Sequence, residues 1–508
     1  FACNRLSNQS FPYPWRTYVE GGLSRKEKRD ISEVVPHYIK ENCITCNLCS
    51  LVCPHGVIRP FLLDKKEEEN APESLKENLI PTTLGDNYKF TIAVSMKDCT
   101  GCGLCANICP GKKQVKALEM VEKSKVMTSE KLKEVEYLFN KVSEKDVMST
   151  SSVKGSQFKR PRFEFSGACA GCGETPYLKL LTQLFGDRLM IANATGCSSI
   201  YGASSPSTPY SVPWANSLFE DNAEFSYGMR IADEVKKNQL KKIILDNIDK
   251  VEEEEKSIYL AYANEVTEET AQALLKVLDH TKIKPLKSLK KNILPVSIWA
   301  VGGDGWAYDI GYNGIDHVLA SGENINILVL DTEVYSNTGG QASKSSKLGA
   351  ICKFAASGKK TPKKDLAKMA LAYPDVYVAC ISLGANPAAC IKVMQEAEKH
   401  QGPSIIIAYS PCIAQGILKG MSNSIEEEKK ATECGYFPIF HYNPETKEFK
   451  MDAKSNFGHY QEFLQGEDRY YSLEKINKEH GKELLQANEE HAKERYQYYE
   501  ERSEEKAA

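Results

Sequence analysis

Two stretches of the sequence decide how its first part folds: residues 43–54 read CITCNLCSLVCP and residues 99–110 read CTGCGLCANICP. Both follow the spacing C-x2-C-x2-C-x3-C-P. Three thiolates on one tight loop can reach three irons of a [4Fe–4S] cube, whereas the fourth follows a helical turn and points toward a neighbouring cube. We therefore expect two cubes, with the ligand sets Cys43, Cys46, Cys49, Cys109 and Cys99, Cys102, Cys105, Cys53.

This spacing is the pattern of bacterial ferredoxins, and it predicts a small α+β domain that holds two cubes. Gly101 and Gly103 suit a loop that wraps closely and points N–H groups at sulfur. The alternative is a pair of structural zinc sites, but these usually join two separated C-x2-C pairs. Two neighbouring cubes conduct single electrons, so this part of the chain needs an electron source and an acceptor.

The whole chain has an ordinary globular composition, with 508 residues, 42% hydrophobic and 26% charged, which suggests two to four domains. The net charge of −3, from 65 basic and 68 acidic residues, argues against a general nucleic-acid binder. No run of about 18 apolar residues appears, so we expect no membrane span. Seventeen cysteines, partly in tight clusters, indicate metal ligation in a reducing compartment and not a disulfide framework. Because the first residue is Phe1, we expect the true N-terminus and any targeting signal to be missing.

From residue 161 onward, short β-branched runs alternate with helical patterns. This alternation predicts an α/β fold, a doubly wound parallel sheet with helices on both faces. The expected strands are Leu189–Ala192, Val296–Val301, Ile325–Leu330, Val376–Ile381 and Ser404–Tyr409.

A further set of cysteines falls where these strands end. Cys169 and Cys172 form a C-x2-C pair, and Cys197 follows the first expected strand. Ligand sites of open α/β sheets collect at the carboxyl edge. Three ligands are one short for a cube, and Cys412, just after the last expected strand, is the best fourth. A zinc site or a redox dithiol would look similar.

Residues 302–306 read GGDGW, directly after one expected strand, and residues 331–340 read DTEVYSNTGG, directly after the next. The glycines let backbone amides approach a pyrophosphate, and the helix that follows directs its N-terminus at the anion. Asp304 offers a hard oxygen, and Thr332 lies one helix and one strand later, so both should reach one Mg²⁺. GDG alone could be an ordinary tight turn, but the pair of segments indicates the Mg-diphosphate site of a thiamine diphosphate enzyme.

With these residues, the chain resembles the C-terminal part of single-chain pyruvate:ferredoxin (flavodoxin) oxidoreductases. The resemblance extends over roughly residues 40 to 420. Its landmarks are residues 43–60, 98–105, 167–174, 193–201, 216–222, 303–306, 309–314 and 332–341.

The resemblance implies a reaction and its cofactors. Pyruvate is decarboxylated oxidatively with coenzyme A to acetyl-CoA and CO₂, and electrons pass one at a time through three [4Fe–4S] clusters to ferredoxin or flavodoxin. It also implies Mg²⁺ and thiamine diphosphate, a homodimer, and an intracellular, low-oxygen location, either the cytoplasm or an anaerobic mitochondrion-like organelle.

The resemblance also assigns residues. Cys169, Cys172, Cys197 and Cys412 would hold a cluster beside the thiamine. Asp304, Thr332 and the Val334 carbonyl would hold Mg²⁺, and Asn337 would act near the substrate carbon. The other cofactor-binding candidates are Glu174, Cys197, Gly303, Gly305, Trp306, Glu333, Tyr335 and Ser336.

The sequence departs from the family in one respect. The glutamate that activates thiamine, the substrate-carboxylate contacts and the coenzyme A domain lie upstream in the family and have no counterpart here, so we expect the chain alone to be inactive. No NADP-reductase-like extension appears at the C-terminal side. The alternatives are another 2-keto acid:ferredoxin oxidoreductase, a non-catalytic iron–sulfur electron-transfer module, or a fusion to another redox module upstream.

These considerations divide the chain as follows. We expect the end of an upstream domain or linker at 1–35, a ferredoxin-like domain at 36–125, a linker at 126–160, a thiamine diphosphate domain with the third cluster at 161–425, a surface insertion within it at about 247–291, and a charged helical extension at 426–508.

Overall fold

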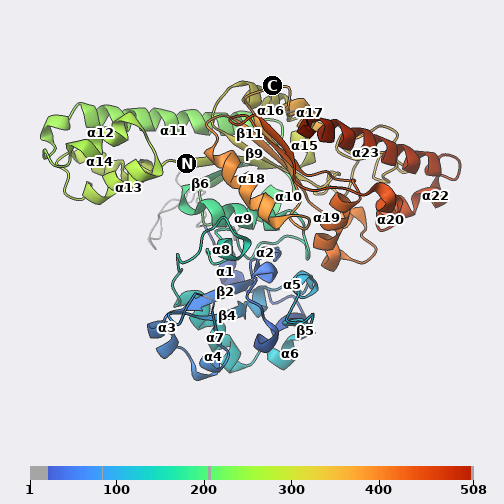
Figure 1. Ribbon diagram of the computed structural model, residues 1–508, viewed down its shortest axis with the longest axis horizontal. Helices are drawn as coiled ribbons and strands as arrows, with labels where there is room; N and C mark the ends of the chain where they lie inside the picture. Colours follow the sequence, from blue (N-terminus) through green and yellow to red (C-terminus); the bar gives the residue numbers. More distant parts are fainter. Residues whose placement is uncertain (1–20, 83, 204–207, 505–508) are drawn as a thin grey trace, which may run out of the picture.

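The computed structural model describes residues 21–82, 84–203 and 208–504. A large α/β unit lies at the centre, a small iron–sulfur-type unit lies below it, and a helical arm projects to one side (Figure 1). Most of segment 1–35, including residues 1–20, lies outside the described residues.

The central sheet has eight strands in the order β13-β12-β10-β11-β9-β8-β6-β7. The six strands from β10 to β7 are parallel, and β12 and β13 add to one edge antiparallel. The strands are β6 (Leu189–Ala194), β7 (Trp214–Ser217), β8 (Ser297–Gly302), β9 (Asn326–Asp331), β10 (Tyr377–Ile381), β11 (Ser404–Tyr409), β12 (Phe440–Asn443) and β13 (Glu448–Met451). The doubly wound parallel sheet predicted from the sequence is therefore confirmed.

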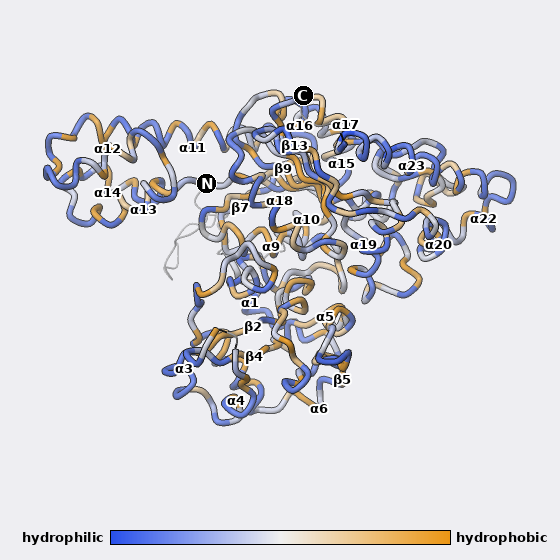
Figure 2. Tube along the Cα trace, viewed as in Figure 1, coloured by the Kyte–Doolittle hydropathy of each residue, from blue (hydrophilic) through white to orange (hydrophobic). Residues whose placement is uncertain are grey.

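Alternate residues of each strand enter two separate hydrophobic clusters. In β10, Tyr377 and Ala379 face one cluster, and Val378 and Cys380 face the other. This alternation is expected of strands buried on both faces, because successive side chains point to opposite sides of a sheet. One face is covered by α9 (Thr175–Phe185) and α18 (Pro387–Lys399), and the other by α15 (Asp304–Ala307), α16 (Tyr312–Ala320), α17 (Leu366–Ala370) and α23 (Gly481–Glu504). Apolar residues concentrate along these central strands (Figure 2).

The small unit contains both cysteine runs. β1 (Val34–Tyr38) pairs antiparallel with β5 (Leu118–Glu122), and a second sheet has the order β2-β4-β3. Each run leads into a one-turn helix, and these two helices, α2 and α5, pack on each other. The elements are α1 (Ser24–Glu27), α2 (Leu48–Leu51), β2 (Ile58–Leu63), α3 (Lys65–Glu69), α4 (Glu73–Glu77), β3 (Ile80–Pro81), β4 (Lys89–Val94), α5 (Leu104–Ile108) and α6 (Lys123–Val126).

The segment expected to be a linker, residues 126–160, contains packed helices. In α7 (Ser129–Asn140), Leu138 is buried against Leu63, Leu75 and Ala93 of the small unit. α8 (Val153–Ser156) then lies against α2, α9 and α18. This segment therefore stabilises the small unit and holds it to the α/β unit.

The helical arm is larger than the expected insertion at about 247–291. It begins with α11 (Asn222–Leu245), which covers β6 and β8 before it projects from the sheet (Figure 1). Leu240 and Ile244 of α11 join Tyr259, Tyr262 and others in a core that belongs to the arm. The arm is completed by α12 (Lys256–Asn264), α13 (Glu268–Val277) and α14 (Lys284–Ser288).

The C-terminal segment, residues 426–508, is not wholly the helical extension that the sequence predicts, because β12 and β13 within it extend the sheet. The helices α19 (Ser424–Glu433), α20 (Tyr460–Leu464), α21 (Asp468–Tyr471) and α22 (Leu473–Ile476) surround these strands. The long helix α23 buries one stripe, Leu485, Ala492 and Tyr499, against the sheet. Charged residues on its other faces hid this packing stripe from the sequence analysis.

Candidate functional site

The cysteines of the small unit lie in two groups, and each group exchanges its last cysteine with the other. Burial raises the pKa of the Cys49 thiol, and repulsion from Cys46, Cys43 and Cys109 raises it further, so these four sulfurs lie together. Burial and the nearby Cys53, Cys102 and Cys99 likewise raise the pKa of Cys105. The structure thus brings together the two sets that the spacing predicts. We call Cys43, Cys46, Cys49 and Cys109 the outer group, and Cys99, Cys102, Cys105 and Cys53 the middle group.

Backbone amides point at the sulfurs, as iron–sulfur ligands require. The distance from N to Sγ is 3.4 Å for Thr45 to Cys43, and 3.3 Å for Gly101 to Cys99. Gly101 and Gly103 have φ of 68° and 83°, and Thr45 and Asn47 take φ of 57° and 64° at the matching positions of the first run. The sequence analysis identified the glycines but could not foresee that a threonine and an asparagine adopt the same left-handed backbone.

The remaining four candidate cysteines also converge, and we call Cys169, Cys172, Cys197 and Cys412 the inner group. Burial is the main cause of the raised pKa of Cys197, with contributions from Glu174, Cys412 and Cys169. Burial raises the pKa of Cys412, and the nearby Glu174 and Cys169 raise it further. Burial also raises the pKa of Cys172, with a contribution from Cys412. Four thiols from three separate loops therefore surround one space at the carboxyl edge of the sheet.

A close backbone approach fixes two of these loops together. Gly173 donates from its N–H to the Pro411 carbonyl at 3.1 Å, and a Cβ on Gly173 would lie 2.6 Å from the backbone of Pro411. A glycine is therefore required beside Cys172 if Cys412 is to reach the group. The Cys412 sulfur in turn lies 3.4 Å from the N–H of Ala414.

Zinc was the alternative for all of these cysteines. Within the described residues, no three His, Cys, Asp or Glu side chains are arranged to hold a single metal ion. The spacing C-x2-C-x2-C-x3-C-P of the two runs is typical of ligands to [4Fe–4S] cubes, whereas structural zinc sites usually join two separated C-x2-C pairs. The donor set therefore fits [4Fe–4S] clusters better than mononuclear zinc.

The middle group lies between the outer and inner groups. On one side, the nearby Cys49 of the outer group raises the pKa of Cys105. On the other side, the backbone of Gly171, between Cys169 and Cys172, hydrogen-bonds the Cys102 thiol. His55, two residues after Cys53, places its Nδ1 3.2 Å from the carbonyl of Ser166. In space, the inner, middle and outer groups thus follow one another from the carboxyl edge of the sheet into the small unit.

A cation site follows the ends of β8 and β9. The Thr332 hydroxyl oxygen lies 3.4 Å from Asp304 Oδ2 and 3.0 Å from the Val334 carbonyl oxygen. Asp304 is 3% exposed, and its Oδ1 has no hydrogen-bond partner among the described residues. Burial and the nearby Asp331 raise the pKa of this carboxyl well above its usual value. A buried, partly unpaired carboxylate beside a hydroxyl and a carbonyl fits Mg²⁺, which prefers hard oxygen ligands.

Ser336 joins this cation site to the inner group. Its hydroxyl oxygen lies 3.4 Å from Thr332 Oγ1 and 3.3 Å from Cys197 Sγ. The two parts of the predicted thiamine site are therefore separated by one side chain. Glu174 completes the space: it is buried, accepts a 2.9 Å hydrogen bond from Tyr201, and has its pKa raised to about 7 by burial.

The chain matches known families in both of its parts. Residues 42–113 match the family described as 4Fe-4S dicluster domain, and residues 289–408 match the thiamine pyrophosphate enzyme, C-terminal TPP binding domain. The chain is 46% identical to pyruvate:ferredoxin oxidoreductase of Moorella thermoacetica over 91% of its own length. Over about nine tenths of its length, the chain therefore matches a part of the pyruvate:ferredoxin/flavodoxin oxidoreductases. The resemblance seen in the sequence is therefore confirmed.

Two further relatives match the chain at a similar level of identity. Pyruvate-flavodoxin oxidoreductase of Klebsiella pneumoniae is 44% identical over 89% of this chain, and the mitochondrial pyruvate dehydrogenase [NADP(+)] of Euglena gracilis is 43% identical over 92%. The chain spans 42% of the M. thermoacetica protein, 40% of the K. pneumoniae protein and 27% of the E. gracilis protein. No helix in the described residues is long and apolar enough to cross a bilayer.

The other candidates around the diphosphate loop lie in different settings. Gly303 caps the N-terminus of α15, and Gly305 and the buried Trp306 lie within this one-turn helix. The ring of Tyr335 would lie 3.5 Å from a Cβ on Gly305. Asn337 is exposed at the tip of the loop. These placements leave the turn and the loop tip free to face a ligand.

Glu333, by contrast, is held by ion pairs inside the protein. Its carboxylate is fully buried and pairs with Lys363 at 3.0 Å and Arg469 at 2.9 Å. It has φ of 62°, and Tyr436 also donates to it. The sequence analysis placed this side chain on the cofactor, whereas the structure gives it a role in holding the loop. Lys363 and Arg469, 30 and 136 residues away, carried no local signal that could have revealed this pairing.

Proposed function

We propose that this chain is the electron-exporting part of an enzyme that oxidatively decarboxylates pyruvate with coenzyme A to acetyl-CoA and CO₂. Electrons leave one at a time through [4Fe–4S] clusters on the inner, middle and outer groups, in that order. The acceptor is ferredoxin or flavodoxin, as the names of the relatives indicate.

One observation carries this proposal: Ser336 touches both the Cys197 sulfur, at 3.3 Å, and the Thr332 hydroxyl, at 3.4 Å. A cluster on the inner group would therefore lie directly beside a cofactor held through Thr332. Such an arrangement suits the removal of single electrons from a reaction at that cofactor. A dehydrogenase that transfers hydride would have no need of it.

The chain's own residues hold and orient the cofactors. Asp304, Thr332 and the Val334 carbonyl hold Mg²⁺, and the turn at Gly303 and Gly305 leaves room for the diphosphate. When bound, thiamine diphosphate supplies the electron sink for decarboxylation, and iron–sulfur clusters accept single electrons. Lys363, pinned between Asp331 and Glu333, keeps the loop in position. We place the exposed Asn337 beside the substrate carbon.

Other functions of the enzyme require residues beyond this set. The relatives are more than twice as long as the matched region, and we assign coenzyme A binding and thiamine activation to the part of the enzyme that these 508 residues do not match. We also propose that the enzyme is a homodimer. We place it in a reducing, low-oxygen intracellular compartment, because thiolate-bound clusters are sensitive to oxidants.

Calorimetry tests the thiamine site directly. After anaerobic reconstitution with iron and sulfide, the chain should bind thiamine diphosphate only when Mg²⁺ is present. Asp304→Asn should weaken this binding at least tenfold, because it removes the anionic ligand of the metal. Asp316→Asn is the matched control. Asp316 lies on α16, accepts a 2.9 Å hydrogen bond from the Tyr373 hydroxyl and does not line the site. Binding that is absent, or independent of Mg²⁺, would contradict the proposal and favour a non-catalytic electron-transfer module.

A further inference from the structure

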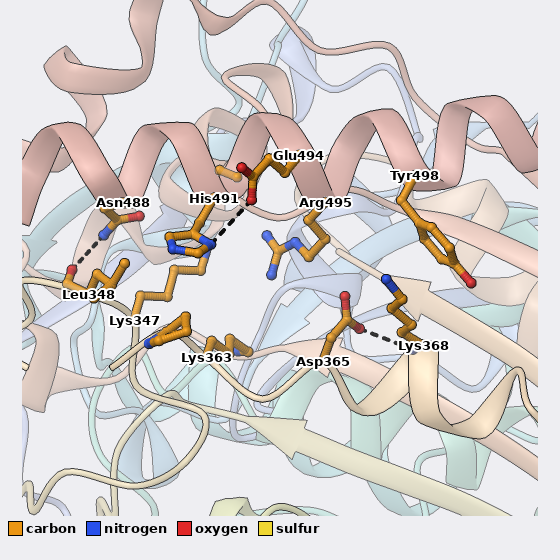
Figure 3. Close-up of a pocket in the computed structure, with 12 residues that line it drawn as sticks. Lys347, Leu348, Lys363, Asp365, Lys368, Asn488, His491, Glu494, Arg495 and Tyr498 are labelled. Atoms are coloured by element: carbon orange, nitrogen blue, oxygen red, sulfur yellow. Dashed lines mark hydrogen bonds and ion pairs between the residues drawn. The ribbon is translucent and has the colours of Figure 1, made fainter. Parts of the chain in front are cut away.

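A separate cavity of about 260 Å³ lies between α23 and the segments that follow the diphosphate loop. Side chains of α23 face those of residues 347–368 across it (Figure 3). Its lining is strongly basic, with the cations Lys347, Lys363, Lys368 and Arg495. None of the sequence motifs includes this cavity.

Two of these cations share a single hydrogen-bond acceptor. Lys347 and Arg495 both donate to the backbone carbonyl of Tyr436, Arg495 through Nη2 at 2.6 Å. Lys347 is 4% exposed, and in the described part of the chain neither residue forms a salt bridge with a carboxylate. The Nε of Arg495 is buried and has no acceptor among the described residues. A buried donor without an acceptor is costly, so this arrangement calls for an anionic partner.

The remaining charges of the cavity supply that partner only in part. Asp365 caps α17 by accepting from the Lys368 N–H at 3.0 Å and also accepts from the Tyr499 hydroxyl at 2.6 Å. Glu494 is exposed and pairs with His491 at 3.4 Å. Burial lowers the pKa of Arg495, but the nearby Asp365 raises it above its usual value. The Arg495 Nε still lacks an acceptor among the described residues. Burial and repulsion from Arg495 lower the pKa of Lys347 well below its usual value, and the nearby Glu333 offsets this only in part.

We propose that this cavity binds a small oxyanion, a phosphate or carboxylate group, between Lys347 and Arg495. Guanidinium groups bind both kinds of oxyanion through directed N–H donors, and the cavity volume limits the ligand to a small molecule. The site differs from the diphosphate site, since no residue assigned to Mg²⁺ or thiamine lines it.

Lys363 connects this cavity to the diphosphate loop. It lines the cavity and also bridges Asp331 and Glu333, the residues on either side of Thr332. An anion in the cavity attracts the ammonium group of Lys363 and weakens its ion pairs with Asp331 and Glu333. The position of Thr332, which lies between these two residues, then changes. Anion binding therefore changes the affinity for Mg-thiamine diphosphate, an effect that rests on the function proposed above. Coupling between two sites is reciprocal, so thiamine diphosphate should change anion affinity by the same factor.

Calorimetric titration of the 508-residue chain tests the site, with inorganic phosphate in one arm and malonate in the other, at constant ionic strength. Mg-thiamine diphosphate is kept saturating so that phosphate cannot occupy the diphosphate site. We expect one phosphate or malonate per chain, bound at least tenfold more weakly by Arg495→Gln and by Lys347→Met. Lys493→Gln is the control, because Lys493 lies on the same helix but pairs with Glu489 at the surface.

The two arms identify the ligand: binding of phosphate alone indicates a phosphate group, and binding of both indicates any small oxyanion. Thermal unfolding guards against misfolded variants, since phosphate should raise the unfolding temperature of the wild-type chain and of Lys493→Gln but not of Lys347→Met. Absence of binding in both arms, or equal binding by all variants, would overturn the site. If the chain fails to bind thiamine diphosphate, the same titration without it still tests the cavity through Arg495→Gln.

Discussion

At the scale of single residues, Cys412 decides whether the chain holds a third cluster. It is separated from Cys197 by more than two hundred residues, yet the two thiols influence each other, together with Cys169 and Cys172. Cys412→Ala should remove about four irons per chain, because a cube that loses one of four thiolates is no longer retained. Iron and sulfide analysis after anaerobic reconstitution measures the loss.

Cys434→Ala is the matched control for this substitution. Cys434 is buried in the core, and its thiol donates to the Ala431 carbonyl at 3.6 Å, away from the three cysteine groups. The control should keep the iron content of the wild-type chain. An iron content that Cys412→Ala leaves unchanged would reject the inner group as a cluster site.

Glu428 gives the chain a pH-dependent stability. Burial raises its pKa from 4.5 to about 8, although the Gly384 N–H donates to it at 2.6 Å. The folded chain thus holds this proton more tightly than the unfolded chain, so the stabilising contribution is present below about pH 4.5 and is lost as the pH rises to about 8.

Glu428→Gln, which is neutral at every pH, should flatten this dependence. Its unfolding temperature should fall less between about pH 5 and pH 8 than that of the wild-type chain. Differential scanning calorimetry across this range provides the measurement. Glu426→Gln, an exposed neighbour on α19, should behave as the wild-type chain does, and a parallel fall in all three proteins would refute the assignment.

The residues that sequence reasoning found are those with a local signature. The cysteine spacing predicted which last cysteine belongs to which group, and the strand-end rule pointed to Asp304, Thr332 and Cys412. Lys363 has no such signature, because its role depends on a loop that returns to Asp331 and Glu333. Backbone geometry was also hidden: nothing about Thr45 in the sequence indicates its positive φ.

At the scale of elements, prediction succeeded where burial sets a pattern on both faces. β8, β9, β10 and β11 begin within one residue of the runs identified from β-branched residues. β13 was missed because it is an edge strand: its Glu448 and Lys450 are exposed, and these polar residues resemble a loop. β12 was missed because it is a run of only four residues, FHYN. Their place in the sheet is set by the pairing of β12 with β10 and of β13 with β12, which no local pattern reveals.

The arm offers a test at this scale, because its core is separate from that of the sheet. Leu274 of α13 is fully buried among residues of the arm alone. Leu274→Ala should destabilise the arm by about 2–5 kcal/mol through the lost transfer energy and the cavity left behind. Hydrogen exchange should accelerate in α12 and α13 and remain unchanged in β9 and β11.

Ile406→Ala serves as the comparison, since Ile406 lies in the sheet core and is equally buried. This substitution should accelerate exchange in the central strands. If Leu274→Ala accelerated exchange throughout the sheet as well, the arm and the sheet would form one cooperative unit, contrary to the separate cores.

At the scale of the whole molecule, the proposed function gives the order of the three groups a meaning, because it implies a direction for electrons. The inner group lies beside the diphosphate loop, the middle group touches it through Gly171, and the outer group lies beyond the middle group in the small unit. On the proposed path, an electron that enters at Cys197 would leave near Cys43 and Cys109. The near-balanced net charge of −3 gives this path no strong overall field, so local charges near the outer group would govern docking of an acceptor.

The last prediction concerns division of labour within the enzyme. The reconstituted chain alone should bind about twelve irons and accept electrons from dithionite, but should form no acetyl-CoA from pyruvate and coenzyme A. Adding the part of the Moorella thermoacetica enzyme that this chain does not match should allow acetyl-CoA formation coupled to ferredoxin reduction. The same mixture with Cys412→Ala should lose ferredoxin reduction, because the first step of the path is broken. Turnover by the chain alone would refute this division, and turnover of 2-oxoglutarate in preference to pyruvate would change the substrate while leaving the electron path intact.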